Sequence, residues 1–289
     1  MIELLTAILN KRLDAAAWAW LDKALAATRG AVNANVFLGN YAAAARRAGK
    51  RALRLDEDEE AQVRRVDAGL NLSVWGADEA VRALLLLSLA HLPLEGHAEL
   101  ATQCYELGDS REQQSWLRAV SLLPGAERHL RTAIDACRTN ILPLFEAIAC
   151  ENPYPARFFP ELNFNQMAMK ALFSRVALSR IVGLEGRSNA DLSRMCFDYL
   201  CEREAAGRTV PEDIWLALIP HIVPGQLPRA LPYLNDASPD ARYWLSVALG
   251  ASGLPAGRSA LQARLGQEPD ARVAGAMQAS LARLNRSGT

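Results

Sequence analysis

Long apolar runs, paired cysteines and an excess of one charge are all missing from this sequence of 289 residues. Its longest strongly apolar stretch, residues 83–92, is about half of the roughly 20 residues that a membrane-spanning helix needs. The N-terminus carries Glu3 and no basic run before its short apolar stretch, unlike a secretory signal. We therefore expect a soluble protein without a transmembrane segment.

The balance of charge and the use of cysteine narrow the class of protein further. Lysine and arginine together number 32, as do aspartate and glutamate, so the formal net charge is zero. This balance argues against a dedicated nucleic-acid-binding protein. The five cysteines form no CxxC pair, whereas secreted disulfide frameworks have denser and even sets. We expect reduced thiols and a cytoplasmic location.

Familiar catalytic and metal-binding motifs are also missing. There is no GxSxG elbow, no glycine-rich loop ending in GK[ST] and no GxGxxG. The four histidines form neither an HExxH motif nor an i,i+4 pair. The Glu-x-x-His pairs of di-metal carboxylate bundles do not occur either. The sequence therefore predicts no metal, no cofactor and no assignable catalytic residue.

What the sequence does contain is helical periodicity. Residues 1–92 have no proline, and apolar residues recur at helical spacing over 13–25. Capping residues, glycines and prolines then separate further amphipathic segments. The predicted helices include 33–48, 78–92, 94–107, 111–123, 126–137, 141–151, 163–175, 189–206 and 256–265. No useful alternating strand pattern appears, so the fold class is all-α.

An internal repeat near the C-terminus suggests how these helices are arranged. The sequence Pro-Asp-Ala-Arg at 239–242 recurs at 269–272, and each copy opens a helix rich in Ala and Leu. A helix pair that recurs after thirty residues resembles a short HEAT-type repeat. We predict an array of helix pairs, an α–α superhelix, with one domain over 1–232 and HEAT-like pairs over 233–289 that continue the same array.

The least ordinary segment is residues 151–170. It places Pro153, Pro155 and Pro160 within eight residues and follows them with a helix that mixes buried and polar positions. Such disagreement between propensity, burial and polarity is typical of functional or strained places. The polar side chains either bind the irregular backbone of 152–162 or line a pocket with the neighbouring aromatics. The sequence leaves both interpretations open.

Several motifs around this segment resemble the EboA family of bacterial proteins. They are Arg138-Thr139-Asn140, residues 145–149 (FEAIA), residues 152–156 (NPYPA), Asn165-Gln166-Met167 and residues 170–173 (KALF). The resemblance extends in weaker form over about 80–210, and Phe164 stands where the family usually has Trp. It implies a protein encoded in a cluster concerned with moving or maturing secondary metabolites. It implies a pathway context and no particular reaction.

From these features we predict a cytoplasmic, non-catalytic binding or scaffold protein in the traffic or maturation of a prenylated or aromatic metabolite. Its partner would be a small, partly apolar metabolite or a protein of the same pathway. The candidate ligand-binding residues are Asn152, Tyr154, Arg157, Asn163, Asn165, Gln166 and Lys170, with Arg138 and Asn140 in support. One alternative is a cofactor-independent enzyme that uses Lys170 or the Glu95/His97 pair. Another is a module that binds only other proteins.

Overall fold

The computed structural model describes residues 1–286 of the chain. Within this range every regular element is helical, and the β interactions are limited to one isolated bridge between Ala52 and Gly76. The predicted all-α class is confirmed. The chain divides into two compact units, Met1–Phe159 and Pro160–Thr289. The predicted domain division after residue 232 and the HEAT type of the C-terminal pairs stay predictions.

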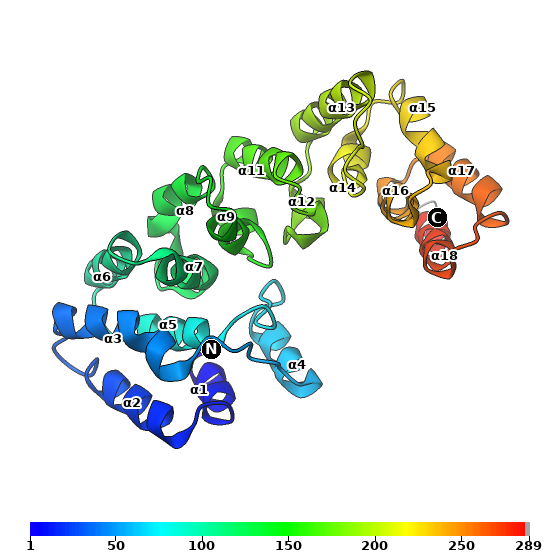
Figure 1. The fold of residues 1–289 in the computed structure, drawn as a ribbon. Coiled ribbons are helices and arrows are strands. Elements are labelled where there is room, and N and C mark those ends of the chain that lie inside the picture. Colours follow the sequence, from blue (N-terminus) through cyan, green and yellow to red (C-terminus); the bar gives the residue numbers. More distant parts are fainter. Residues whose placement is uncertain (287–289) are drawn as a thin grey trace. The chain divides into compact units, whose positions relative to one another are not determined.

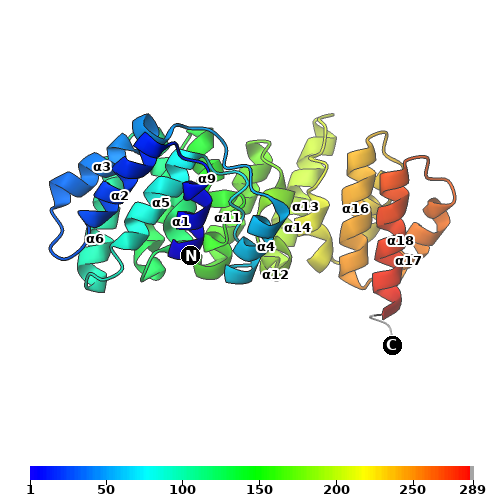
Figure 2. The same ribbon diagram turned by 90° about the horizontal axis from the view of Figure 1, so that it is seen from below.

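The N-terminal unit is built around one helix that is buried over all but its last residue. Its elements are α1 (Ile2–Asn10), α2 (Ala15–Ala26), α3 (Ala34–Ala48), α4 (Glu57–Val66), α5 (Ala77–Ser88), α6 (Leu94–Glu106), α7 (Ser110–Ala119), η1 (Val120–Leu122), η2 (Ala126–His129), α8 (Leu130–Ala136), α9 (Leu142–Ala149) and α10 (Tyr154–Phe158). All residues from Ala77 to Leu87 are buried. Helix α5 packs against α1 and α3 (Figures 1 and 2) and also against α7, which in turn packs against α9 (Figure 1). The apolar run of α5 therefore forms the centre of this unit.

Buried ion pairs join α5 to α7. Arg82 and Asp78 pair at 2.9 Å within α5, and Arg111 of α7 reaches Asp78 at 2.8 Å. Arg118 of α7 lies 3.0 Å from Glu79. Because an unpaired buried charge is strongly destabilising, these pairs allow charged residues to occupy an otherwise apolar helix.

The proline-rich segment is more regular than expected. The sequence predicts irregular backbone over 152–162, but Tyr154–Phe158 forms the short helix α10. Pro153 occupies its N-cap and Pro155 lies in its first turn, where a missing backbone N–H costs nothing. The prediction was wrong for these five residues and for residues 161 and 162, which begin the next helix after Pro160, because prolines at a helix start leave its hydrogen bonds intact.

The C-terminal unit is also built from packed helices, and several of its elements are only three to five residues long. Its elements are α11 (Glu161–Phe173), η3 (Leu178–Arg180), α12 (Leu184–Arg187), α13 (Ala190–Ala205), α14 (Trp215–Leu218), η4 (Ile219–His221), α15 (Leu227–Ala230), η5 (Leu231–Asn235), α16 (Pro239–Ser252), α17 (Pro255–Leu265) and α18 (Ala271–Arg286). Helices α11, α13, α14, α16 and α18 contact one another in that order (Figure 1). The prolines between 211 and 239 divide the chain into short helical turns, because each one interrupts a longer helix.

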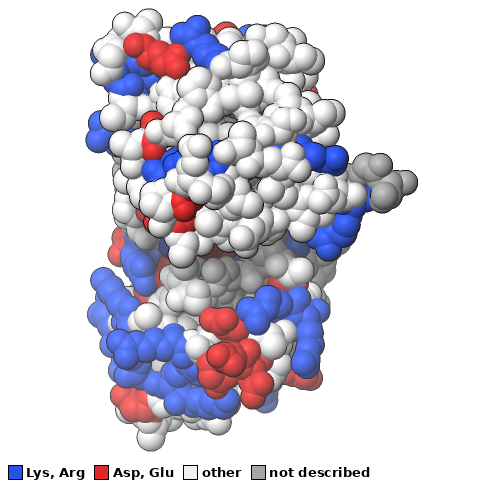
Figure 3. Space-filling view, turned by 90° about the vertical axis from the view of Figure 1, so that its right-hand side faces the viewer, with Lys and Arg blue, Asp and Glu red and all other residues white. Residues whose placement is uncertain are grey.

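Charges of both signs gather around α4 in the lower part of Figure 3. Acidic residues occupy the first turn of this helix, and Arg64 and Arg65 occupy its last turn. This order suits the helix dipole. Among the described helices, none has the length and apolar character required to cross a bilayer.

Candidate functional site

Two of the predicted ligand-binding residues hydrogen-bond to backbone in the N-terminal unit. Asn152 donates to the carbonyls of Leu117 and Ala147 at 2.8 and 2.9 Å, and its Oδ1 accepts the N–H of Tyr154 at 3.0 Å. The Tyr154 hydroxyl donates to the Ala126 carbonyl at 2.7 Å. Both side chains are buried. These bonds support the structural interpretation, and ligand contact by either residue stays a prediction.

The other candidates in this unit lie at its surface. Arg157 is exposed and forms a bidentate pair with Asp67, with N–O distances of 2.7 and 2.5 Å. Burial raises the pKa of Asp67, but the hydrogen bonds from Arg157 and the Gly69 N–H, together with the charge of Arg157, outweigh it, so the pKa is lowered. Arg138 is exposed and pairs with Asp135 at 2.8 Å. Asn140 is exposed as well.

The remaining candidates belong to α11 in the C-terminal unit. Asn165 is buried and exchanges side-chain hydrogen bonds with Asn189, the N-cap of α13. Gln166 is exposed, whereas Asn163 and Lys170 are half-buried. The structure thus brings Asn165 to a residue that the sequence marks only as a helix cap. The binding role of these four residues stays a prediction.

The alternative acid–base pair, Glu95 and His97, is separated by the fold. His97 is completely buried, and its Nε2 lies 3.1 Å from the Leu86 carbonyl. Burial lowers the pKa of His97. Glu95 is exposed at the start of the same helix. A side chain in the core and one in solvent cannot share a substrate, so this pair does not form a site.

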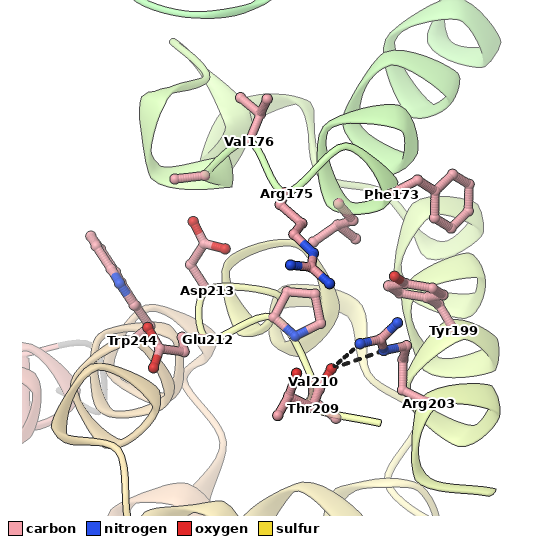
Figure 4. A pocket seen from close by; sticks show the side chains of 13 residues that line it. Phe173, Arg175, Val176, Tyr199, Arg203, Thr209, Val210, Glu212, Asp213 and Trp244 are labelled. Carbon is pink, nitrogen blue, oxygen red and sulfur yellow. Dashed lines mark hydrogen bonds between the residues drawn. The ribbon is translucent and has the colours of Figure 1, made fainter. Parts of the chain in front are cut away.

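A hollow of about 580 Å³ in the C-terminal unit offers a different site (Figure 4). Its walls come from the end of α11 and the turn after it, from α13, from the segment before α14, and from α16. They are formed by Leu172, Phe173, Arg175, Val176, Ala177, Tyr199, Arg203, Thr209, Val210, Pro211, Glu212, Asp213 and Trp244. The volume lies within the usual range for small-molecule sites, and the mixture of aromatic and charged walls is typical of them. We call it the Arg175 pocket.

Arg175 has an unusual backbone conformation for its residue type. Its φ of 58° is left-handed, and it directly follows Ser174, the C-cap of α11. The N–H of Val176 donates to the Ala171 carbonyl at 2.8 Å, and that of Arg175 donates to Leu172 at 3.2 Å. These two bonds define a Schellman motif, whose left-handed position is usually glycine. An arginine here costs about 1 kcal/mol more than glycine, and backbone strain of this kind is common at functional sites.

The guanidinium of Arg175 enters the hollow (Figure 4). The side chain is exposed, and no described residue, from 1 to 286, accepts a hydrogen bond from it or forms an ion pair with it. Guanidinium groups bind carboxylates and phosphates through paired N–H donors. Arg175 is therefore available to an anionic group of a ligand.

Aromatic side chains flank this cation. Phe173 is 60% exposed and meets the ring of Tyr199 edge to face, with centroids 4.9 Å apart. The guanidinium carbon of Arg203 lies 5.8 Å from the centre of the Tyr199 ring. Arg203 is held in place because its Nε and Nη2 donate to the Thr209 carbonyl at 2.8 and 2.6 Å (Figure 4). Trp244 of α16 supplies another aromatic wall. These rings can cover an apolar part of a ligand.

Two other hollows have less suitable walls. One of about 330 Å³ in the C-terminal unit is largely aliphatic, with Glu185 and Arg283 paired with each other at 2.5 Å. One of about 520 Å³ lies along α6 and is lined mainly by Glu95, Glu99 and other polar residues. Neither combines an unpaired charge with aromatic walls. Within residues 1–286 no group of three His, Cys, Asp or Glu side chains could hold a metal ion.

The sequence did not indicate the Arg175 pocket. Its residues come from segments that are distant in the chain, and only tertiary packing brings them together. A helix end without glycine at Ser174-Arg175-Val176 is the one local signal, and it is weak because many helices end without glycine.

The family model described as metabolite traffic protein EboA matches residues 1–219. The match includes every wall residue of the Arg175 pocket except Trp244. No curated protein and no solved structure matches the chain.

Proposed function

The chain belongs to the EboA family of metabolite traffic proteins, and on this premise we propose that it binds a small, partly apolar metabolite with an anionic group in the Arg175 pocket. The observation that carries the proposal is the unpaired guanidinium of Arg175. The backbone of Arg175 has a left-handed conformation that would favour glycine, and its side chain lies beside aromatic walls. The anionic group would pair with Arg175, and the apolar part would lie against Phe173, Tyr199 and Trp244.

This proposal keeps the non-catalytic role and the cytoplasmic location that the sequence predicts. It moves the main ligand contacts from the predicted residues of 152–170 to the walls of the Arg175 pocket. Asn152, Tyr154 and Asn165 would then support the fold, because their polar groups already bond to other parts of the protein. The sequence also predicts a prenylated or aromatic metabolite, and identifying the bound molecule would test this prediction.

The test is native mass spectrometry of the protein purified from its own host, compared with the mass after denaturation. We expect the wild type to retain a small molecule that Arg175→Gln loses. Arg175→Gly should lose it too, while melting at the same or a higher temperature because glycine suits the left-handed position. The matched control is Arg194→Gln, which removes an exposed arginine of α13 that pairs with Asp191 and Asp198.

Retention of the molecule by Arg194→Gln and its loss from both Arg175 variants would support the pocket. A bare mass for the wild type would contradict the proposal. So would equal retention by the wild type and both Arg175 variants, because the molecule would then be bound elsewhere.

A further inference from the structure

A buried carboxylate shares the Arg175 pocket with the unpaired guanidinium. Asp213 lies in the segment before α14 and is only 6% exposed. Its Oδ2 accepts the N–H of Ser179 at 3.0 Å. No cationic side chain of residues 1–286 pairs with this carboxylate. Asp213 is therefore a buried carboxyl group whose partners are neutral donors.

Arg175 and Asp213 line the same hollow without pairing with each other (Figure 4). Arg175 extends into the hollow from the turn after α11. The Oδ2 of Asp213 accepts a hydrogen bond from the N–H of Ser179. Opposite charges that can meet in a partly desolvated space usually do, because their attraction is stronger there than in water. The Asp213 carboxylate is hydrogen-bonded to the Ser179 N–H, and the Arg175 guanidinium has no partner within residues 1–286, so a molecule with both charges would pair with each of them.

We propose that the metabolite in the Arg175 pocket is a zwitterion of the amino-acid type, with an acidic group on Arg175 and an ammonium group on Asp213. This inference rests on the proposed function and specifies the class of ligand. An ammonium suits Asp213 better than a neutral hydroxyl, because a buried carboxylate gains most from a full opposite charge. The aromatic walls would hold the side chain of the zwitterion, as in the proposed function.

The environment of Asp213 gives independent support. Burial raises the pKa of Asp213, and backbone hydrogen bonds only partly oppose this rise. A ligand ammonium would favour the ionised carboxylate and lower its pKa again. Binding of a zwitterion should therefore weaken as the pH falls through the pKa of Asp213, because the protonated carboxyl group no longer attracts the ammonium.

Three small probes of one shape test this assignment. L-Phenylalanine carries both charges, 3-phenylpropanoate lacks the ammonium, and 2-phenylethylamine lacks the carboxylate. Their affinities are measured by ligand-observed NMR on the full chain. We expect the wild type to bind phenylalanine about ten-fold more tightly than 3-phenylpropanoate. The Asp213→Asn variant should remove this difference and leave the affinity for 3-phenylpropanoate unchanged.

The controls separate this inference from the proposed function. In Asp213→Asn the new amide keeps an oxygen acceptor for the Ser179 N–H, so unchanged melting of this variant shows that the fold is intact. Asp191→Asn removes an exposed carboxylate of α13 that lies outside the pocket and pairs with Arg194, and it should keep the preference for phenylalanine. Equal binding of phenylalanine and 3-phenylpropanoate by the wild type, lost in Arg175→Gln, would overturn the zwitterion and support the anion site. If neither probe binds the wild type at millimolar concentration while the protein from its host still retains a molecule that Arg175→Gln loses, the amino-acid class is overturned and the proposed function stands.

Discussion

Asn165 and Asn189 form a reciprocal pair of side-chain amides. The Nδ2 of Asn165 donates to the Oδ1 of Asn189 at 3.0 Å, and the Nδ2 of Asn189 donates back at 2.9 Å. The same Oδ1 of Asn189 accepts the N–H of Leu192 and caps α13. The pair therefore connects the middle of α11 to the start of α13, and it fixes the geometry of two helices that line the Arg175 pocket.

We expect Asn165→Ala to lower the free energy of unfolding by about 1–3 kcal/mol, because the amide of Asn189 loses its buried partner. Chemical unfolding in urea measures this change. The matched control is Gln166→Ala on the next residue of α11, whose exposed side chain should contribute little. An unchanged unfolding midpoint for Asn165→Ala, with loss of the bound metabolite, would contradict the structural role and favour direct ligand contact.

Local signals allowed much of the fold to be predicted. Asn189 followed by an apolar period predicted a helix over 189–206, and the structure has it at Ala190–Ala205. The apolar run before Pro93 likewise predicted a helix over 78–92, and the structure has α5 at Ala77–Ser88. Such features depend on residues within a few positions of one another, where capping and periodicity are decisive.

The candidate site could not be predicted in the same way. Asn152 and Tyr154 are candidates by sequence because they are polar or aromatic in an unusual segment, but their partners are backbone carbonyls whose positions depend on tertiary packing. Arg175 has no motif around it. Its left-handed φ and its place beside Tyr199 and Asp213 appear only when α11, α13 and the segment before α14 are packed together.

Acid should destabilise the protein partly through Glu59 of α4. Arg12 lies 3.0 Å from its carboxylate and lowers its pKa from 4.5 to about 2, with a smaller contribution from Lys11. Because the folded pKa is depressed, the stabilisation is complete above pH 4.5 and is lost as the pH falls toward 2. We expect Glu59→Gln to cost roughly 1–3 kcal/mol at neutral pH and to flatten the loss of stability in this pH window. Urea unfolding across the window measures both effects.

The adjacent residue provides the control for this prediction. Glu60 forms an exposed pair with Arg64 at 3.3 Å, and such pairs contribute about 0.5 kcal/mol or less. Glu60→Gln should therefore leave the dependence on pH close to that of the wild type. Parallel curves for the wild type and Glu59→Gln would contradict the role of Glu59.

The two longest helices at the C-terminus should respond in opposite directions to the same substitution. A Cβ added to Gly250 of α16 would lie 2.4 Å from the Cβ and Oγ of Ser280 on α18 and 2.7 Å from its Cα. Gly250→Ala must therefore push α16 and α18 apart, and we expect it to destabilise the protein by about 1–3 kcal/mol. A Cβ added to Gly275 of α18 meets nothing within 4 Å, so Gly275→Ala should stabilise the helix by up to about 1 kcal/mol. Thermal unfolding of both variants measures the contrast, and a stabilising Gly250→Ala would show that the two helices do not approach each other this closely.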